Sequence, residues 1–214
     1  MLAEIIKNTV ALLAIVEPLG VIPIYLQATA GYSDTEKRAY ARFLGMVVIV
    51  ALVVAGLAGD ELLKALSISL GAMRVGGGVI VLMVAIAMVL GQQNAVKRTP
   101  VEAEAAEEAA GRGLVPLGIP LLVGPAAFSF MLAHSQWHWQ APLSLVTVLL
   151  PPVIVGLLVW LTFAFAGRLQ ARLTPAMMVV IERIAGFLLA GIAVELMAGG
   201  LRELFPLLAS PALP

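Results

Sequence analysis

Six long runs of apolar residues constrain the fold of this chain more than any other feature of its sequence. They cover approximately residues 3–29, 41–64, 68–91, 114–136, 142–167 and 176–204. A transmembrane helix needs about 20 predominantly apolar residues, and 61% of the 214 residues are hydrophobic whereas 12% are charged. A soluble domain of this length buries too little surface to hide so many apolar side chains. The sequence therefore predicts an all-α polytopic membrane protein with six transmembrane helices.

Charge and residue usage exclude several classes of function. The 13 basic residues balance the 13 acidic ones, so we expect no nucleic-acid partner. The chain has no cysteine, and therefore no thiol nucleophile and no thiolate metal site. His134 and His138 have the spacing of some metal ligands but lack a third ligand, so we expect no metal and no cofactor. Without a paired Asp motif, a Ser–His pair or a zinc motif, the chain is not expected to be an enzyme.

The Lys and Arg residues of the loops predict the orientation in the membrane, because basic loops stay in the cytoplasm. The loops after the first, third and fifth runs hold Lys37, Arg38, Arg42, Lys97, Arg98, Arg112, Arg168 and Arg172. The termini and the remaining loops hold only Lys7, Lys64 and Arg202. We therefore expect both termini outside, with Trp137 and Trp139 in an interfacial aromatic belt.

Two pairs of segments suggest an internal repeat. "MRVGGGVIVLMVAIAMVLG" (73–91) aligns with "ERIAGFLLAGIAVELMAGG" (182–200), which places Arg74 on Arg183, and "AIVEPLG" (14–20) aligns with "LLVGPAA" (121–127). This divides the chain into a three-span repeat (1–91), a cytoplasmic linker (92–113) and a second three-span repeat (114–214). Three is an odd number, so the second copy enters the membrane from the other side. Such a 3+3 inverted repeat is typical of secondary transporters.

The paired segments also predict two broken helices. Glu17-Pro18 and Gly124-Pro125 lie near the middle of the first and fourth spans, and proline removes a backbone donor and clashes with the preceding turn. Broken backbone at this depth is tolerated only where it is buried in protein or lines a cavity. Each break would also expose a half-helix N-terminus that suits a carboxylate. The alternative is a pair of kinks that serve packing alone.

Several motifs resemble those of the MarC family, which includes the SnatA-type small neutral amino-acid transporters. They are "EPLGVIPIYL", "SLGAMRVGGGVIVLMVAIAMVLG", "VPLGIPLLVGPAA" and "ERIAGFLLAGIAVELMAGGL". The resemblance covers nearly the whole chain except residues 92–113. It implies six spans, a plasma-membrane location and transport of amino acids such as glycine and alanine. The chain departs from the family pattern at Glu17, Ala126 and Glu195, where Asn, Gly and Gln are usual.

The candidate site follows from the two breaks and the charged residues within the spans. The candidates for substrate binding are Glu17, Pro18, Leu19, Gly20, Gly124, Pro125, Ala126, Arg74 and Arg183. The candidates for ion coupling are Glu17 and Glu195, because a carboxylate within a membrane span is functional by default. Structural roles for the charged residues remain open as alternatives. Glu17 could form an ion pair with an arginine, the arginines could bind carbonyl groups freed by a broken helix, and the Glu195 side chain could extend to the membrane surface.

The predicted function is secondary transport of a small neutral amino acid, with coupling to protons or cations left open. The alternatives are a channel or passive pore for a small solute, and a membrane protein without transport activity. The expected partners are the amino acid and the lipid bilayer, and homo-oligomerisation is left open.

Overall fold

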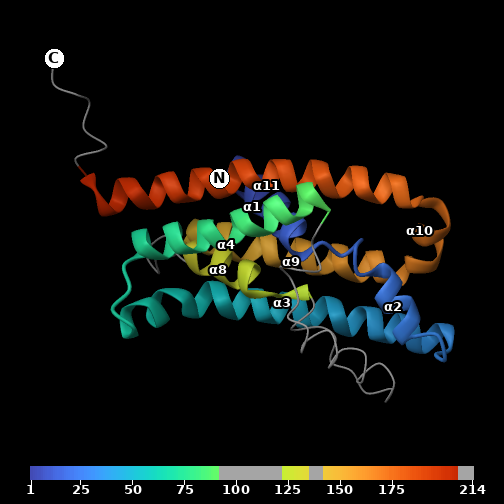
Figure 1. Cartoon of the computed structure of the whole chain (residues 1–214). Helices are drawn as coiled ribbons and strands as arrows, with labels where there is room; N and C mark the ends of the chain where they lie inside the picture. Colours follow the sequence, from blue (N-terminus) through green and yellow to red (C-terminus); the bar gives the residue numbers. More distant parts are fainter. Residues whose placement is uncertain (92–121, 135–141, 207–214) are drawn as a thin grey trace.

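A computed structural model describes residues 1–91, 122–134 and 142–206, and Figure 1 shows the path of the chain. The described residues contain helices and no strand. The helices are α1 (Leu2–Val16), α2 (Ile22–Ala28), α3 (Asp34–Ala65), α4 (Leu70–Leu90), α8 (Pro125–Ala133), α9 (Pro142–Ala164), α10 (Ala166–Arg172) and α11 (Pro175–Leu204). The predicted linker 92–113, the first part of the fourth predicted span (114–121), and Trp137 and Trp139 lie outside the described residues.

Four helices in the described part of the chain are long and apolar enough to cross a membrane: α3, α4, α9 over Leu145–Ala164, and α11. This confirms the all-helical membrane fold. The first predicted span, however, is not one helix, because α1 has 15 residues and α2 has 7. At 1.5 Å per residue α1 extends about 22 Å, less than the thickness of a bilayer core. Of the fourth predicted span, the structure describes the 9-residue α8, the three residues before it and His134 after it.

Capping residues account for several helix boundaries, including one that the sequence analysis placed too late. The predicted second span began at residue 41, with "GYSDTEKR" as a loop, whereas α3 begins at Asp34. The Ser33 hydroxyl accepts a hydrogen bond from the Glu36 N–H (3.3 Å), and the Glu36 carboxylate accepts one from the Ser33 N–H (2.7 Å). This capping box starts a helix among polar residues. The side chains of Ser69 and Thr174 cap α4 and α11.

Glycines allow α4 and α11 to pack closely and antiparallel. A Cβ atom added at Gly186 would lie 2.7 Å from Met88 Cβ and 2.9 Å from the Ala85 carbonyl oxygen. At the other end, a Cβ atom at Gly200 would lie 2.5 Å from the Gly71 carbonyl oxygen. Small residues let membrane helices approach closely where the hydrophobic effect supplies little drive for association. The two helices therefore meet backbone to backbone.

The helices α3 and α9 form a second antiparallel pair of the same kind. A Cβ atom added at Gly45 would lie 2.7 Å from the Gly156 carbonyl oxygen, and one added at Gly56 would lie 2.9 Å from Val148 Cγ1. Figure 1 shows α3 and α9 running side by side along the bundle, with α4 and α11 forming the opposite layer.

The helix packing has a regular pattern. Extensive contacts join α1 to α9, α11 and α8, and join α8 to α3 and α4. Exchange of α1 with α8, α3 with α9, and α4 with α11 turns the pair α1–α9 into α8–α3 and the pair α1–α11 into α8–α4, and it leaves α1–α8 unchanged. A glycine of each helix also packs against a methionine of the other, Gly186 against Met88 and Gly78 against Met197, although the sequence repeat pairs Gly186 with Gly77.

Candidate functional site

Backbone geometry at Glu17 ends α1 in the middle of the first predicted span. Glu17 adopts a left-handed conformation, with φ 49° and ψ 61°, and its N–H still donates to the Leu13 carbonyl oxygen at 2.9 Å. The next residue, Pro18, has no N–H to continue the helix. The chain turns through residues 17–21 before α2 begins at Ile22. The predicted break at Pro18 is therefore present.

This conformation is energetically unfavourable for glutamate. A residue other than glycine in a sparsely populated backbone region costs on the order of 1–3 kcal/mol, and such residues cluster at functional sites. Glu17 is 9% exposed. Gly20 leaves room for its carboxyl group, because a Cβ atom there would lie 3.4 Å from Glu17 Cδ and Oε1. The break thus places a charged side chain inside the bundle.

A cavity of about 290 Å³ lies beside this break, between α1, α9 and α11. Most of its lining is apolar. The polar side chains are the Glu17 carboxylate, the Glu182 carboxylate from α11 and the Thr162 hydroxyl from α9. Pro18 and Leu19 of the break also line it, together with Val10, Leu13, Ala14, Leu158, Met178, Ile181, Ala185, Leu188, Leu189 and Ile192. Two carboxylates and a hydroxyl in an apolar surround can hold an ammonium group or another cation, because opposite charge is attracted strongly in a low dielectric.

A second, more polar cavity of about 140 Å³ lies toward the N-terminal end of α1. It is lined by Lys7, Arg74, His134 and Glu195, with Ile192, Leu196 and Gly199. Lys7 Nζ forms an ion pair with Glu195 Oε2, which joins α1 to α11. Ile192 lines both cavities, so it separates this polar cluster from the space beside Glu17.

Arg74 makes contacts that hold three helices together. Its Nε lies 3.4 Å from the carbonyl oxygen of Ala133, the last residue of α8, and a guanidinium nitrogen lies 3.1 Å from Glu203 Oε2 on α11. The last carbonyl groups of a helix lack partners within the helix. Arg74 thus binds a carbonyl group at the C-terminal end of α8, and not one freed by the break before Pro125.

The remaining candidates do not gather around Glu17. Arg183 is exposed, although Glu182 next to it faces the cavity. Glu195 belongs to the polar cluster near Lys7. The residues Gly124, Pro125 and Ala126 form the start of α8, with Pro125 at its first position, and they do not line the 290 Å³ cavity.

The helical structure is also interrupted in the predicted fourth span. Leu122 is helical, Val123 and Gly124 are not, and α8 begins at Pro125. His134 is the C-cap that follows α8, and its Nδ1 lies 2.8 Å from the Phe130 carbonyl oxygen. Among the described residues no three His, Asp or Glu side chains are close enough to hold a metal ion.

Sequence reasoning missed three members of these cavities. Lys7 contributed only to the predicted orientation, and neither Glu182 nor Thr162 was a candidate site residue. The signal for Glu182 was present, because it is a carboxylate within an apolar run. Its neighbour Arg183 concealed it, since adjacent opposite charges suggest a local pair.

Comparison with known protein families identifies the family of this chain. The family described as MarC family integral membrane protein matches residues 2–205. The chain belongs to the MarC family. Among MarC relatives, the UPF0056 membrane protein YvbG of Bacillus subtilis is 28% identical over 98% of this chain and 100% of its own length. The UPF0056 membrane protein YhcE of Escherichia coli is 26% identical over 94% of this chain and 93% of its own length. The UPF0056 membrane protein MJ1677 of Methanocaldococcus jannaschii is 28% identical over 90% of this chain and 93% of its own length. No solved structure matches this MarC chain.

Proposed function

We propose that this MarC-family protein is a secondary transporter of small neutral amino acids of the glycine and alanine type. The observation that carries the proposal is the 290 Å³ cavity at the break of α1, where Glu17 and Glu182 face an apolar surround. Sites for small molecules usually measure about 300–1,000 Å³, so a cavity of this size favours a small solute. Apolar walls suit a short aliphatic side chain.

The cavity offers more polar groups to the ammonium group of an amino acid than to its carboxylate. A carboxylate of Glu17 or Glu182 can accept hydrogen bonds from the substrate ammonium group, and the Thr162 hydroxyl can donate one to the substrate carboxylate. Two carboxylates together with a zwitterion carry net negative charge into a low-dielectric space. Because buried charge must be compensated, we propose that a proton or another cation accompanies the substrate.

The proposed architecture is the 3+3 inverted repeat, with both termini outside the plasma membrane. Its support is the antiparallel packing of α4 with α11 and of α3 with α9, and a contact pattern that survives exchange of the two halves. Helical structure is interrupted near Pro18 and before Pro125, two positions that the sequence repeat relates. In transporters of this kind the site lies at the interface of the two repeats.

Counterflow in proteoliposomes tests the transport proposal. Vesicles loaded with unlabelled alanine should accumulate labelled alanine or glycine transiently, and a large amino acid such as tryptophan should not compete. Matched vesicles without protein provide the control. Uncoupled flux without counterflow would instead favour the passive pore, and the absence of any flux would favour a protein without transport activity.

A further inference from the structure

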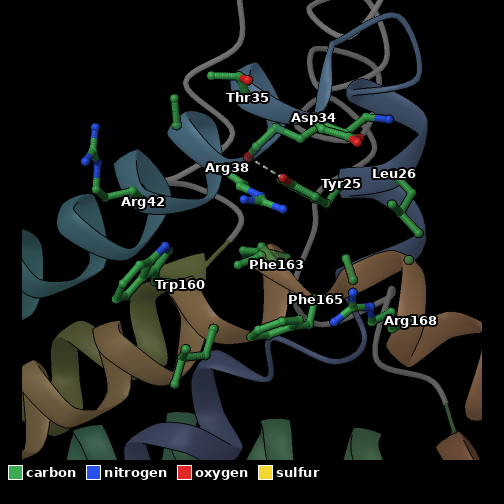
Figure 2. A pocket seen from close by; sticks show the side chains of 16 residues that line it. Tyr25, Leu26, Asp34, Thr35, Arg38, Arg42, Trp160, Phe163, Phe165 and Arg168 are labelled. Carbon is green, nitrogen blue, oxygen red and sulfur yellow. Dashed lines mark hydrogen bonds between the residues drawn. The ribbon is translucent and has the colours of Figure 1, made fainter.

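A further hollow lies at the end of the bundle that holds α2, away from the polar cluster at Lys7. It has a volume of about 800 Å³ and lies between α2, the first turns of α3, the end of α9 and the start of α10. Figure 2 shows its lining, with aromatic rings from α2 and α9 and arginines from α3 and α10. The proposed transport function does not use this hollow.

The charge of the hollow is strongly unbalanced. Lys37, Arg38, Arg42 and Arg168 line it, and Asp34 is the single carboxylate in its lining. None of these four cations has an ion-pair partner among the residues that the structure describes. Several cations in one place repel each other, so an anion between them is stabilised.

The floor of the hollow is aromatic and fixed. The Tyr25 and Phe163 rings stack with their centroids 4.7 Å apart, and the Tyr25 hydroxyl donates to the Lys37 carbonyl oxygen at 2.7 Å. The Arg168 guanidinium lies 5.7 Å from the centroid of the Phe165 ring. In Figure 2, Arg38 reaches toward Tyr25 and Phe163, with Arg42 and Arg168 to either side. These contacts hold the backbone around the arginines in place.

The hollow spans the boundary between the apolar and polar parts of the bundle. The span-forming part of α9 ends at Ala164, and Trp160 and Phe165 near that end are 37% and 47% exposed. Arg168 follows shortly after Phe165 in the chain, and the charged first turn of α3 lines the same hollow. Aromatic side chains with a basic neighbour at this depth are typical of the membrane–water interface. A free anion would contact the arginines but would leave the exposed aromatic flank unused.

We infer that this hollow binds one anionic phospholipid, with the phosphate between Arg38, Arg42 and Arg168 and an acyl chain along Trp160 and Phe165. Arginine binds phosphate through parallel N–H donors, and basic pockets between membrane helices bind anionic headgroups. The site distinguishes lipids by headgroup charge, so it prefers phosphatidylglycerol or cardiolipin to phosphatidylcholine.

Trp160 provides a local probe of occupancy. The chain has three tryptophans, so a Trp137→Phe, Trp139→Phe protein reports from Trp160 alone. Brominated phosphatidylglycerol and brominated phosphatidylcholine are titrated against it in mixed vesicles, and quenching gives the relative affinity at Trp160. Since each basic residue near an anionic lipid contributes about five-fold, we expect at least a five-fold preference for phosphatidylglycerol.

Variants separate the proposed site from general attraction to the membrane. Arg38→Gln with Arg168→Gln should bring the preference close to one, whereas Lys at both positions should retain most of it. Arg202→Gln, in the last turn of α11 at the opposite end of the bundle, is the matched control and should leave the preference unchanged. Circular dichroism and elution volume check that each variant is folded.

Three outcomes would overturn the inference. The first is equal quenching by the two brominated lipids. The second is an unchanged preference in the Arg38→Gln, Arg168→Gln protein. The third is loss of the preference when glycerol phosphate is added at an ionic strength matched with sodium chloride, since that would assign the site to free phosphate. Each result is independent of whether the protein transports amino acids.

Discussion

At the scale of a single residue, Glu17 combines two unfavourable properties, a left-handed backbone and a buried carboxylate. Among residues other than glycine, asparagine tolerates the left-handed region best, which gives a physical reason for the asparagine that the resemblance to the MarC family implies at this position. A carboxylate in its place adds nothing to the turn. Its presence in a strained position favours a role in the cavity.

Glu17→Gln should therefore keep the fold and counterflow exchange but lose the dependence of uptake on a pH gradient. Glu17→Asn should do the same and raise the free energy of unfolding by about 1 kcal/mol, because it relieves backbone strain. Counterflow, gradient-driven uptake and thermal unfolding in detergent measure these effects. If Glu17 is instead one member of a buried ion pair, Glu17→Gln should lower the free energy of unfolding by about 3–5 kcal/mol. Such a loss of stability would refute a role of Glu17 in coupling.

The two intramembrane arginines are expected to behave differently. Arg74→Gln removes the contacts with Ala133 and Glu203, so it should lower the free energy of unfolding by about 1–3 kcal/mol with an unchanged KM for alanine. Arg183 is exposed, and Arg183→Gln should change stability by less than about 0.5 kcal/mol. Thermal unfolding and concentration-dependent uptake check both variants. A stable Arg74→Gln protein with a greatly raised KM would restore Arg74 as a substrate ligand.

At the scale of helices, close packing at glycines adds to the Arg74–Glu203 ion pair in joining α4 to α11. Gly186→Ala places a methyl group against the backbone of α4, and overpacking of this kind costs about 1–3 kcal/mol. Gly191 lies on the same helix with nothing within 4 Å of an added Cβ atom, so Gly191→Ala is the matched control. Thermal unfolding in detergent should show a lower midpoint for the first variant only. Equal midpoints would contradict the close approach.

Sequence patterns predicted some of these helices well and others poorly, for physical reasons. The bounds of α4 and α11 agree with the predicted runs because Ser69 and Thr174 cap them where the apolar residues begin. Proline alone was an unreliable sign of a break, since Pro151 and Pro152 lie inside α9. The chain breaks at Pro18 because the residue before it leaves the helical region. The location of Glu182 in the cavity depends on which face of α11 is turned toward α1. The residue pattern of one helix does not contain this information.

At the scale of the whole molecule, the arrangement of the basic residues predicts the orientation. The absence of cysteine from the sequence allows single cysteines to report it. Arg168→Cys should be protected from an impermeant thiol reagent in intact cells, and Arg202→Cys should react. Reaction of both with the reagent after permeabilisation is the control. Labelling at position 168 but not at 202 in intact cells would show that the protein has the opposite orientation.

The pairing of α4 with α11 and of α3 with α9 has a consequence for biogenesis. Each long helix of the first half has its main neighbour in the second half: α3 begins at Asp34 and its neighbour α9 at Pro142, and α4 begins at Leu70 and its neighbour α11 at Pro175. During synthesis, the glycine faces of α3 and α4 therefore meet lipid until the ribosome has delivered α9 and α11. We expect residues 1–91, expressed alone, to be degraded rapidly and to be rescued by co-expression of residues 114–214. Pulse-chase labelling would detect this mutual dependence of the two halves.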